Sequence, residues 1–549
     1  MKGLMQDHPL LLTGVLDYAA RWHPEQVVVT RTVEGPIVRS TYAEVHERAR
    51  LCALALRRLG ITQGDRVATL AWNTCRHLES WYGIMGLGAV CHTLNPRLFL
   101  ADLEYIINHA EDKILMLDLD LAGLIAKLRP KLPTVQQFIV LTDRQHMHKV
   151  EEAGLQGCLC YEDLIDAERQ YLSGFQWVRV DENDACGLCY TSGTTGRPKG
   201  VLYSHRSNYL QSFTMSMPDA CCLTSATTVL AIVPMFHANS WALAFGAPMF
   251  GAKLVLPGPY LDGESLYSLL ESECCTMSAG VPTIFTALLT YLRETQKRLS
   301  MLKLITIGGA ACPPLLLEAF QGEYGVEMRH MWGMTELSPI GSCAGFKGTL
   351  PPMSKKEQLA LQLKQGRPPI FVDMRIVDDS GKVLPHDGKA YGDLQVRGPH
   401  VISRYFRHDK DATLEDNWFT TGDVATIDRY GHFQITDRSK DVIKSGGEWV
   451  SSIEVEGVIM SHPAVLEAAV IGVPHPKWTE RPLLVVVPHP GRQPSKDELL
   501  GYFRGKIAKW WIPDDVVFVK EIPHTATGKV SKLTLRQQLK DYQSSQSKL

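Results

Sequence analysis

The stretch YTSGTTGRPKG, from Tyr190 to Gly200, combines residue types that bind phosphate. Its glycines let backbone N–H groups turn toward an anion, its Ser and Thr hydroxyls donate hydrogen bonds, and Lys199 adds a positive charge. The P-loop of many nucleotide-binding proteins requires a Gly-Lys pair followed by Ser or Thr, whereas Lys199 follows Pro198 and precedes Gly200. A flexible linker is the alternative, but the strand-like segments ACGLCY and GVLYSH flank the stretch. The residues therefore predict a phosphate loop of another kind.

A second chemical candidate is the pair Cys186 and Cys189, which stands just ahead of this loop. A redox or metal-binding pair needs both thiols on one side, whereas residues three apart on a strand point to opposite faces. No second CxxC motif and no pair of histidines completes a zinc site. We therefore interpret both cysteines as buried residues of a core strand. The 13 cysteines of the chain are expected to be reduced thiols of an intracellular protein.

The elements around these groups must position them. Residues Thr41 to Gly60 place apolar side chains at helical spacing and end on a glycine. Apolar runs typical of buried strands are DRVATLAW, KILMLDLD, QFIVLTD, KLVLPGP and LKLITIGG. Strands that alternate with helices predict a parallel α/β sheet that is covered on both faces.

The pattern changes between Gly366 and Asp437. Short alternating segments such as FVDMRIVDDSGKVLP, GDLQVRGP and DVATIDRYGHFQITD contain turn signals at DSG and RYG. They predict an antiparallel β subdomain. After Asp441 a mixed α/β pattern returns and forms a compact unit to about Lys540, which a polar tail follows.

Length, charge and hydropathy narrow the possible classes. A chain of 549 residues is too long for one core. The net charge of −2 gives no sign of a nucleic-acid or acidic-lipid partner. The longest apolar run, Trp241 to Leu256, is interrupted by Gly, Pro and Lys, so no transmembrane segment is expected. The ending Ser547-Lys548-Leu549 predicts import into peroxisomes if the host is eukaryotic, and otherwise a cytoplasmic location.

Seven motifs, taken together, resemble those of the adenylate-forming superfamily, which includes acyl-CoA synthetases, non-ribosomal adenylation domains and beetle luciferases. YTSGTTGRPKG is similar to the signature loop of that superfamily. The other six follow in the superfamily's order and extend the resemblance over nearly the whole chain: VPMFHANSW (233–241), GGAACP (308–313), WGMTELSP (332–339), WFTTGDVATID (418–428), DRSKDVIKSGGEWVSSIEVE (437–456) and PHTATGKVSK (523–532).

The resemblance implies an α/β fold with a large N-terminal domain, made of two parallel αβ sheets and an antiparallel β subdomain, and a small mobile α+β C-terminal domain. It places these domains at residues 1–436 and 442–549, with a hinge at 437–441. The implied reaction has two steps: a carboxylate attacks the α-phosphate of ATP and releases pyrophosphate, and CoA then attacks the acyl-AMP. ATP, Mg2+ and CoA are the implied cofactors, and a small carboxylic acid is the implied substrate. A homodimer is left open.

By the same resemblance, the phosphate loop would hold the β- and γ-phosphates. The loop residues concerned are Thr191, Ser192, Gly193, Thr194, Thr195, Gly196 and Lys199. Glu336 and Thr191 would offer hard oxygen ligands to Mg2+, and Thr335 would bond to the α-phosphate. Gly333 follows the aromatic Trp332 and precedes Thr335 and Glu336 at the spacing that the superfamily shows.

The rest of the nucleotide is assigned in the same way. Trp332 would stack on adenine, where the superfamily usually has Tyr, because either ring supplies an aromatic face. Ala310 and Ala311 belong to the loop that would flank the adenine. Asp423 would accept hydrogen bonds from the two ribose hydroxyls, which suits a carboxylate.

The C-terminal motifs resemble the part of these enzymes that moves between the two steps. Lys529 would reach the α-phosphate as the catalytic lysine, because a long flexible stem suits a group that must arrive and leave. Arg438 would support the ribose, and Lys440 matches the hinge position. After rotation a second loop would face the site and leave room for the pantetheine arm of CoA; its residues are Lys444, Gly446, Gly447 and Trp449.

The acid substrate is indicated by VPMFHANSW, which looks most like medium- and long-chain fatty-acid ligases. His237 would take a catalytic place between the acyl pocket and the thiol channel. Trp241 would gate the acyl tunnel, with core packing as its alternative, and Met334 is also assigned to the substrate. Short-chain, branched, thioether or aryl acids stay open. So do an adenylation enzyme for a carrier protein and a luciferase-like oxygenase. A non-catalytic ATP-binding regulator would require the loss of Lys529 or Glu336, and both are present.

Overall fold

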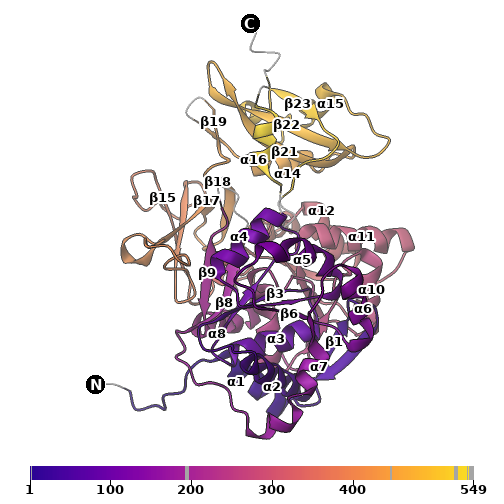
Figure 1. Cartoon of the computed structure of the whole chain (residues 1–549). Coiled ribbons are helices and arrows are strands. Elements are labelled where there is room, and N and C mark those ends of the chain that lie inside the picture. The colour runs from indigo at the N-terminus through magenta and orange to yellow at the C-terminus, as the bar shows by residue number, and fades with distance from the viewer. Residues whose placement is uncertain (2, 192–196, 446–447, 525–529, 541, 543–549) are drawn as a thin grey trace.

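The computed structural model describes the chain except for residues 2, 192–196, 446, 447, 525–529, 541 and 543–549 (Figure 1). Two seven-stranded sheets and a four-stranded antiparallel sheet form a large part, and a further sheet of five strands forms a small part above it (Figure 1). This architecture confirms the predicted fold class. The expected boundaries at 436 and 441 stay predictions.

The first seven-stranded sheet is parallel except for its last strand, β2, which runs antiparallel to β1. Its strands contain the predicted segments KLVLPGP and LKLITIGG as β11 and β13. In spatial order the strands are β14 (Glu327–His330), β13 (Leu304–Ile307), β12 (Met277–Gly280), β10 (Thr228–Ala231), β11 (Lys253–Leu256), β1 (Val27–Arg31) and β2 (Ile37–Thr41).

The second seven-stranded sheet repeats this plan, with β9 as its antiparallel edge strand. The predicted strands DRVATLAW, KILMLDLD and QFIVLTD correspond to β3, β5 and β6. In spatial order the strands are β7 (Leu159–Cys160), β6 (Gln137–Val140), β5 (Ile114–Leu117), β3 (Arg66–Leu70), β4 (Val90–Thr93), β8 (Ala185–Tyr190) and β9 (Gly200–Ser204).

Helices cover these sheets because successive strand residues point to opposite faces and both faces are apolar. Val229 and Val67, one from each sheet, belong to one shared core, whereas their neighbours Leu230 and Ala68 face two separate outer cores. The helices of the large part are α1 (Leu12–Trp22), α2 (Tyr42–Arg58), α3 (Cys75–Met85), α4 (Leu100–Ala110), α5 (Ala122–Leu128), α6 (Met147–Glu152), α7 (Tyr161–Asp166), α8 (His205–Ser216), α9 (Leu243–Met249), α10 (Gly263–Ser272), α11 (Pro282–Thr295), α12 (Pro314–Glu323) and α13 (Lys355–Gln362).

The predicted helix from Thr41 to Gly60 is α2. Thr41 caps it by accepting a hydrogen bond from the backbone N–H of Glu44, whose side chain accepts one in return from the N–H of Thr41. Such a capping box satisfies two backbone donors that a helix start leaves without a partner inside the helix. The Glu44 that completes the box stands three residues after the cap, which is the spacing this motif needs.

The predicted antiparallel subdomain is the four-stranded sheet. Its strands are β15 (Asp373–Val377), β16 (Tyr391–Arg397), β17 (Phe419–Ile427) and β18 (Phe433–Arg438). Trp332, Phe419 and Phe433 share a core with Val201 and Tyr203 of β9. The edge of the second sheet therefore packs directly against this subdomain.

The small part is a sheet with both faces covered. Its strands are β20 (Glu448–Val450), β19 (Ile443–Ser445), β22 (Thr479–Pro488), β21 (Val465–His475) and β23 (Asp515–Phe518). Val470 and Ile471, adjacent on β21, face different cores, one closed by α14 (Ser452–Ile459) and α15 (Lys496–Tyr502) and the other by α16 (Lys532–Gln538).

An ionic cluster joins the two parts where β18 ends. The Asp437 carboxylate accepts a hydrogen bond of 2.7 Å from the backbone N–H of Ser452, at the start of α14. The Lys532 ammonium lies 2.8 Å from Glu456 and also donates to the Ser452 hydroxyl. Burial alone would lower the pKa of Lys532, but the charges of Glu456 and Asp437 outweigh it and raise that pKa. Both sides of the expected hinge therefore contribute to one cluster.

The cysteine pair behaves as interpreted. Cys186 and Cys189 are buried on β8 and belong to different cores, but a bulge between Ala185 and Gly187 interrupts the alternation of the strand, so the expected placement on opposite faces does not follow. All 13 cysteines are free thiols. Across the described residues, none of the helices combines the length and the apolar character that a membrane crossing requires. The Ser547-Lys548-Leu549 ending lies outside the described residues.

A buried ion-pair network ties α2 to α3 and α7. The Arg48 guanidinium lies 2.8 Å from Glu79, whose side chain is 1% exposed, and 2.9 Å from Glu162. The Arg76 guanidinium pairs with Glu162 and with Glu34. These groups line a cavity of about 470 Å3.

We predict that Arg48→Met lowers the free energy of unfolding by about 3–5 kcal/mol, because it leaves the buried Glu79 carboxylate without its cation. Urea unfolding followed by fluorescence measures this loss. The control is Arg169→Met, whose exposed pairs with Glu47 and Asp166 should contribute less than about 1 kcal/mol. Equal losses in the two variants would contradict a role of the buried network in stability.

Candidate functional site

The phosphate loop connects the paired strands β8 and β9. Tyr190 faces Gly200 across the two strands, so the loop leaves and re-enters the sheet at one place. The Thr191 N–H donates to the Lys199 carbonyl at 2.9 Å, and the Lys199 N–H donates to the Thr191 hydroxyl at 3.3 Å. The predicted residues Ser192, Gly193, Thr194, Thr195 and Gly196 lie outside the described residues. The structure thus fixes both ends of the predicted loop.

The second segment of the site runs from Trp332 to Pro339 and follows β14. A Cβ added at Gly333 would lie 2.2 Å from the Pro339 carbonyl oxygen, so only glycine fits this turn. The Met334 N–H donates to the same carbonyl at 2.8 Å. The Thr335 carbonyl accepts a hydrogen bond of 2.8 Å from the Tyr203 hydroxyl, on β9. The strand that leaves the phosphate loop therefore also holds this turn.

Glu336 is a buried carboxylate within reach of the loop. It is 8% exposed, and its Oε1 accepts a hydrogen bond of 2.8 Å from the Tyr405 hydroxyl. Burial raises the pKa of Glu336, and the Tyr405 hydrogen bond with the charges of Arg438 and Lys199 offsets part of that rise. A buried carboxylate with incomplete compensation favours a nearby cation. Glu336 and Thr191 offer the hard oxygens that Mg2+ prefers, and their role as its ligands stays a prediction.

Three predicted nucleotide residues come together on the antiparallel sheet. Asp423 and Arg438 face each other across β17 and β18, with 3.1 Å between Arg438 Nε and Asp423 Oδ1. The Trp332 indole N–H donates to Asp423 Oδ2 at 3.0 Å, and its ring packs edge-to-face on Phe433. The carboxylate assigned to the ribose is thus oriented by the residue assigned to the adenine.

The acyl segment lies beside the phosphate loop. His237 is half-buried and shares a small cavity of about 20 Å3 with Thr191. A cavity of that size holds about one water molecule, so an alkyl chain would require movement. Its lining residues are Thr93, Asn95, Leu98, Ile106, Tyr190, Thr191, Phe236 and His237.

Trp241 lies in a run of left-handed backbone. Residues 238–242, none of them glycine, have φ between 44° and 64°. Contacts on both sides hold this strained run, since the Ser240 hydroxyl donates to the Val233 carbonyl and the Asn239 amide donates to Asn208. The Trp241 ring, 7% exposed, packs against the backbone at Gly308, in the GGAACP loop. The acyl segment and the loop assigned to the adenine are therefore in contact, with Ala310 and Ala311 exposed just beyond.

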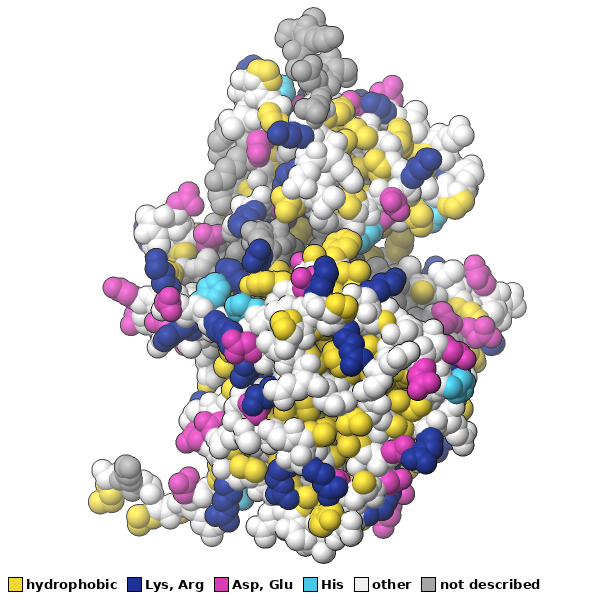
Figure 2. Space-filling view, in the orientation of Figure 1, with side chains coloured by type: hydrophobic (Ala, Val, Ile, Leu, Met, Phe, Trp, Pro, Cys, Tyr) yellow, Lys and Arg dark blue, Asp and Glu magenta, His cyan; other side chains and the backbone are white. Residues whose placement is uncertain are grey.

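The small part provides the remaining predicted residues. Lys529, Gly446 and Gly447 lie outside the described residues, as do the side chains of Lys444 and Trp449. His524 and Val530, the described residues on either side of 525–529, form an antiparallel bridge. Lys440 is exposed after β18. Figure 2 shows that Lys, Arg and His side chains lie on the visible face near the boundary between the large and small parts.

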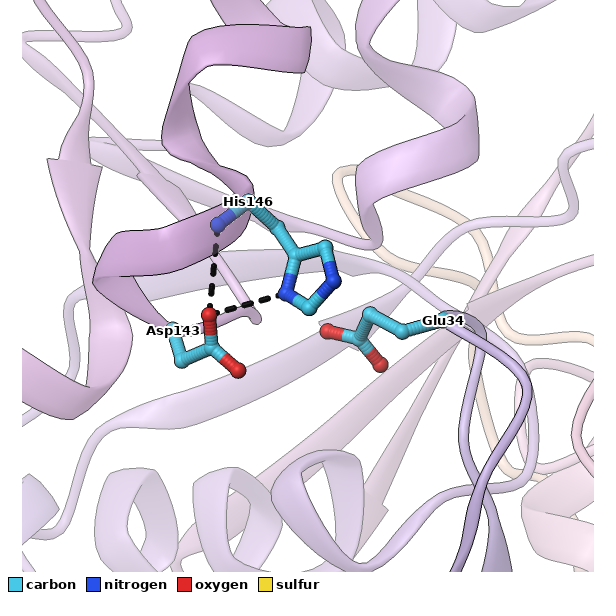
Figure 3. Close-up of side chains that lie close together, drawn as sticks. All are labelled: Glu34, Asp143 and His146. Atoms are coloured by element: carbon cyan, nitrogen blue, oxygen red, sulfur yellow. Dashed lines mark hydrogen bonds and ion pairs between the residues drawn. The ribbon is translucent and has the colours of Figure 1, made fainter.

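A different group has the composition of a metal site. Glu34, Asp143 and His146 have ligand atoms within 4.8 Å of one another (Figure 3). Asp143 caps the short helix that contains His146, and Glu34 pairs with Arg76. These contacts account for the group without an ion, and none of its members lines the cavity at Thr191 and His237.

Two site residues have no counterpart in the sequence prediction. Tyr203 bonds to Thr335, and Tyr405 bonds to Glu336. Neither lies in a spaced motif with its partner, and 69 residues separate Tyr405 from Glu336. The one available signal was that Tyr203 follows the phosphate loop closely on an apolar strand.

Comparisons with known proteins agree with this arrangement. Residues 16–406 match the family model described as AMP-binding enzyme, and residues 454–529 match the model of the AMP-binding enzyme C-terminal domain. The 3-methylmercaptopropionyl-CoA ligase of Ruegeria lacuscaerulensis is 47% identical over 541 residues, which cover 98% of this chain and 99% of that protein.

Two other relatives have different stated substrates. The medium-chain-fatty-acid–CoA ligase of Ectopseudomonas oleovorans is 46% identical over 98% of each chain. The long-chain-fatty-acid–CoA ligase of Thermus thermophilus is 45% identical over 98% of this chain and 97% of its own. Among solved structures, an anthranilate CoA ligase in complex with anthranoyl-AMP has a TM-score of 0.85 at 26% identity, covering 98% of this chain and 99% of its own.

We predict that Trp332→Phe weakens ATP binding by about 10- to 100-fold, because it keeps an aromatic ring but removes a hydrogen bond to a buried carboxylate. Isothermal titration calorimetry measures the affinity. Trp511→Phe is the matched control, since the described residues give its buried indole N–H no hydrogen-bond partner. Unchanged ATP affinity in Trp332→Phe would show that Asp423 needs no orientation by the indole.

Proposed function

Because the chain belongs to the family of AMP-binding enzymes, we propose that it is an acyl-CoA synthetase that joins a medium- or long-chain fatty acid to CoA. ATP would be converted to AMP and pyrophosphate through an acyl-adenylate. The observation that carries this proposal is that Thr191 at the base of the phosphate loop shares a cavity with His237, while the charges of Lys199 and of Arg438, the partner of Asp423, both act on Glu336. The relatives named as medium- and long-chain fatty-acid ligases support the acid class.

The residues divide the task by charge. The attacking carboxylate and the triphosphate repel each other, so the site must gather positive charge around them. Lys199 and the N–H groups of the loop would hold the phosphates that leave, and Thr335 would bond to the α-phosphate. Bound Mg2+ would neutralise phosphate charge between Glu336 and Thr191. Asp423 would fix the ribose, and thereby the direction of the α-phosphate.

The small part would supply the residues that change between the steps. Lys529 would stabilise charge on the α-phosphate during adenylation. Rotation at 437–441 would then bring residues 444–449 to the site, where Gly446 and Gly447 would give the pantetheine arm a narrow passage. His237 lies beside the phosphate loop, where the acyl carbonyl and the incoming thiol would meet.

A thioether acid is the second candidate substrate. Two relatives, from Ruegeria lacuscaerulensis and Ruegeria pomeroyi, are 3-methylmercaptopropionyl-CoA ligases, at 47% and 46% identity. A thioether sulfur is apolar and polarizable, so a wall that accepts methylene groups also accepts it. The small apolar residues after Trp241 suit either acid.

We predict that, with ATP and CoA present, the purified protein releases AMP and pyrophosphate most efficiently with acids of eight or more carbons. The measurement is kcat/KM for butyrate, octanoate, palmitate, benzoate and 3-(methylthio)propionate. Each buried CH2 contributes about 0.8 kcal/mol, so two methylene groups should raise kcat/KM about tenfold until the pocket is full. A maximum at 3-(methylthio)propionate would replace the fatty-acid proposal by the thioether one.

We predict that Lys529→Ala slows acyl-AMP formation by about 10²–10³-fold, the loss typical of one preorganised donor to a transition-state charge. Pyrophosphate release measures this step. Thioester formation from supplied acyl-AMP should largely persist, because Lys529 would act before CoA enters. Lys540→Ala serves as the control, and equal loss of both steps would contradict the assigned role of Lys529.

A further inference from the structure

We infer that Tyr405 is a positioning residue of the nucleotide site, which orients Glu336 with its hydroxyl and Lys199 with its ring. Tyr405 lies in the connection between β16 and β17, away from every motif that predicted a site residue. It is half-buried, with one side toward Glu336 and the other toward the phosphate loop. The inference rests on the proposed roles of Glu336 and Lys199.

The hydroxyl acts on a group that has little access to water. It donates to Glu336 Oε1 at 2.8 Å, and Glu336 is 8% exposed. A hydrogen bond to a buried carboxylate is strong, because no solvent molecule replaces it when it is lost. The bond therefore fixes the rotation of the carboxylate. That rotation decides where its oxygens meet a phosphate-bound cation.

The ring acts on the opposite charge. The Lys199 ammonium lies 4.7 Å from the centroid of the Tyr405 ring, within the range of a cation–π contact. Lys199 is exposed and its stem is flexible, so this contact gives its charge a preferred place near the loop.

Tyr405 also keeps the two charges apart. Both Lys199 and Glu336 are described, and no ion pair joins them. A direct pair would direct the ammonium to Glu336 instead of to a phosphate. With Tyr405 contacting both, each charge has an uncharged partner, so neither charge is neutralised before a nucleotide binds. The site therefore keeps positive charge available before ATP arrives.

The backbone next to Tyr405 is tied to the base of the phosphate loop. The Phe406 N–H donates to the Gly200 carbonyl at 2.8 Å. The Phe406 ring packs edge-to-face on His109 of α4, whose Nδ1 lies 2.6 Å from the Tyr190 hydroxyl. Tyr190 and Gly200 are the two ends of the loop. These contacts therefore fix the position of Tyr405 relative to the phosphate loop.

Two variants separate the two contacts. Tyr405→Phe keeps the ring and removes the hydroxyl, and Tyr405→Leu removes both. ATP binding is measured by isothermal titration calorimetry in Mg2+ and in EDTA, with kcat and KM for ATP measured alongside. We expect Tyr405→Phe to weaken binding about 10- to 100-fold in Mg2+ and to leave binding in EDTA unchanged. We expect Tyr405→Leu to lose about a further two- to fivefold in both conditions.

The control variant is Tyr171→Phe, because Tyr171 also carries a cation, Arg58, over its ring but lies on an exposed helix outside the site. It should bind ATP like the wild type. Equal losses of Tyr405→Phe in Mg2+ and in EDTA would assign Tyr405 to general folding and overturn the inference. ATP binding by Tyr405→Phe in Mg2+ that equals wild-type binding would also overturn the inference. A wild-type protein that binds ATP but activates no acid would contradict the proposed function, whereas the binding comparison would still decide the role of Tyr405.

Discussion

The pairing of Tyr190 with Gly200 is the contact on which the site depends. It holds the two ends of the phosphate loop together at the edge of a parallel sheet, and the strand that follows provides Tyr203 for the turn at Thr335. The same strand packs into the core of the antiparallel subdomain. One hairpin therefore sets the loop relative to both the turn that contains Glu336 and the sheet that contains Asp423. A change in its register would turn every side chain of β9 to the opposite face.

The two buried carboxylates of the site are oriented by the same kind of donor. Glu336 and Asp423 come from different elements, and each is bonded by an aromatic side chain of another element, Tyr405 or Trp332. The Tyr405 hydroxyl and the Trp332 indole N–H donate hydrogen bonds but carry no net charge. The Glu336 carboxylate therefore stays oriented, and its negative charge remains available to the cation that it is proposed to bind, whereas Asp423 also pairs with Arg438.

The sequence predicted the elements better than the contacts between them. Apolar runs identified β3, β5 and β13, and helical spacing with a glycine stop identified α2, because these signals are local. The fold class and the family followed from motifs of fixed spacing. The bonds from Tyr405 to Glu336 and from Trp332 to Asp423 join residues 69 and 91 positions apart. No period or spacing relates such positions, since tertiary packing alone brings them together.

The cluster of Asp437, Ser452, Glu456 and Lys532 has a mechanical consequence for the proposed rotation. Lys532 lies three residues after Lys529, and Asp437 lies three residues before Lys440. An atom close to an axis of rotation moves little, whereas an atom far from it sweeps a long arc. If the axis passes near this cluster, its buried charges keep their partners while the outer edge of the small domain travels. The cluster would then lie at the pivot of the rotation. A modest change of backbone torsion at the hinge would move distant parts of the small domain far enough to replace Lys529 at the site by residues 444–449.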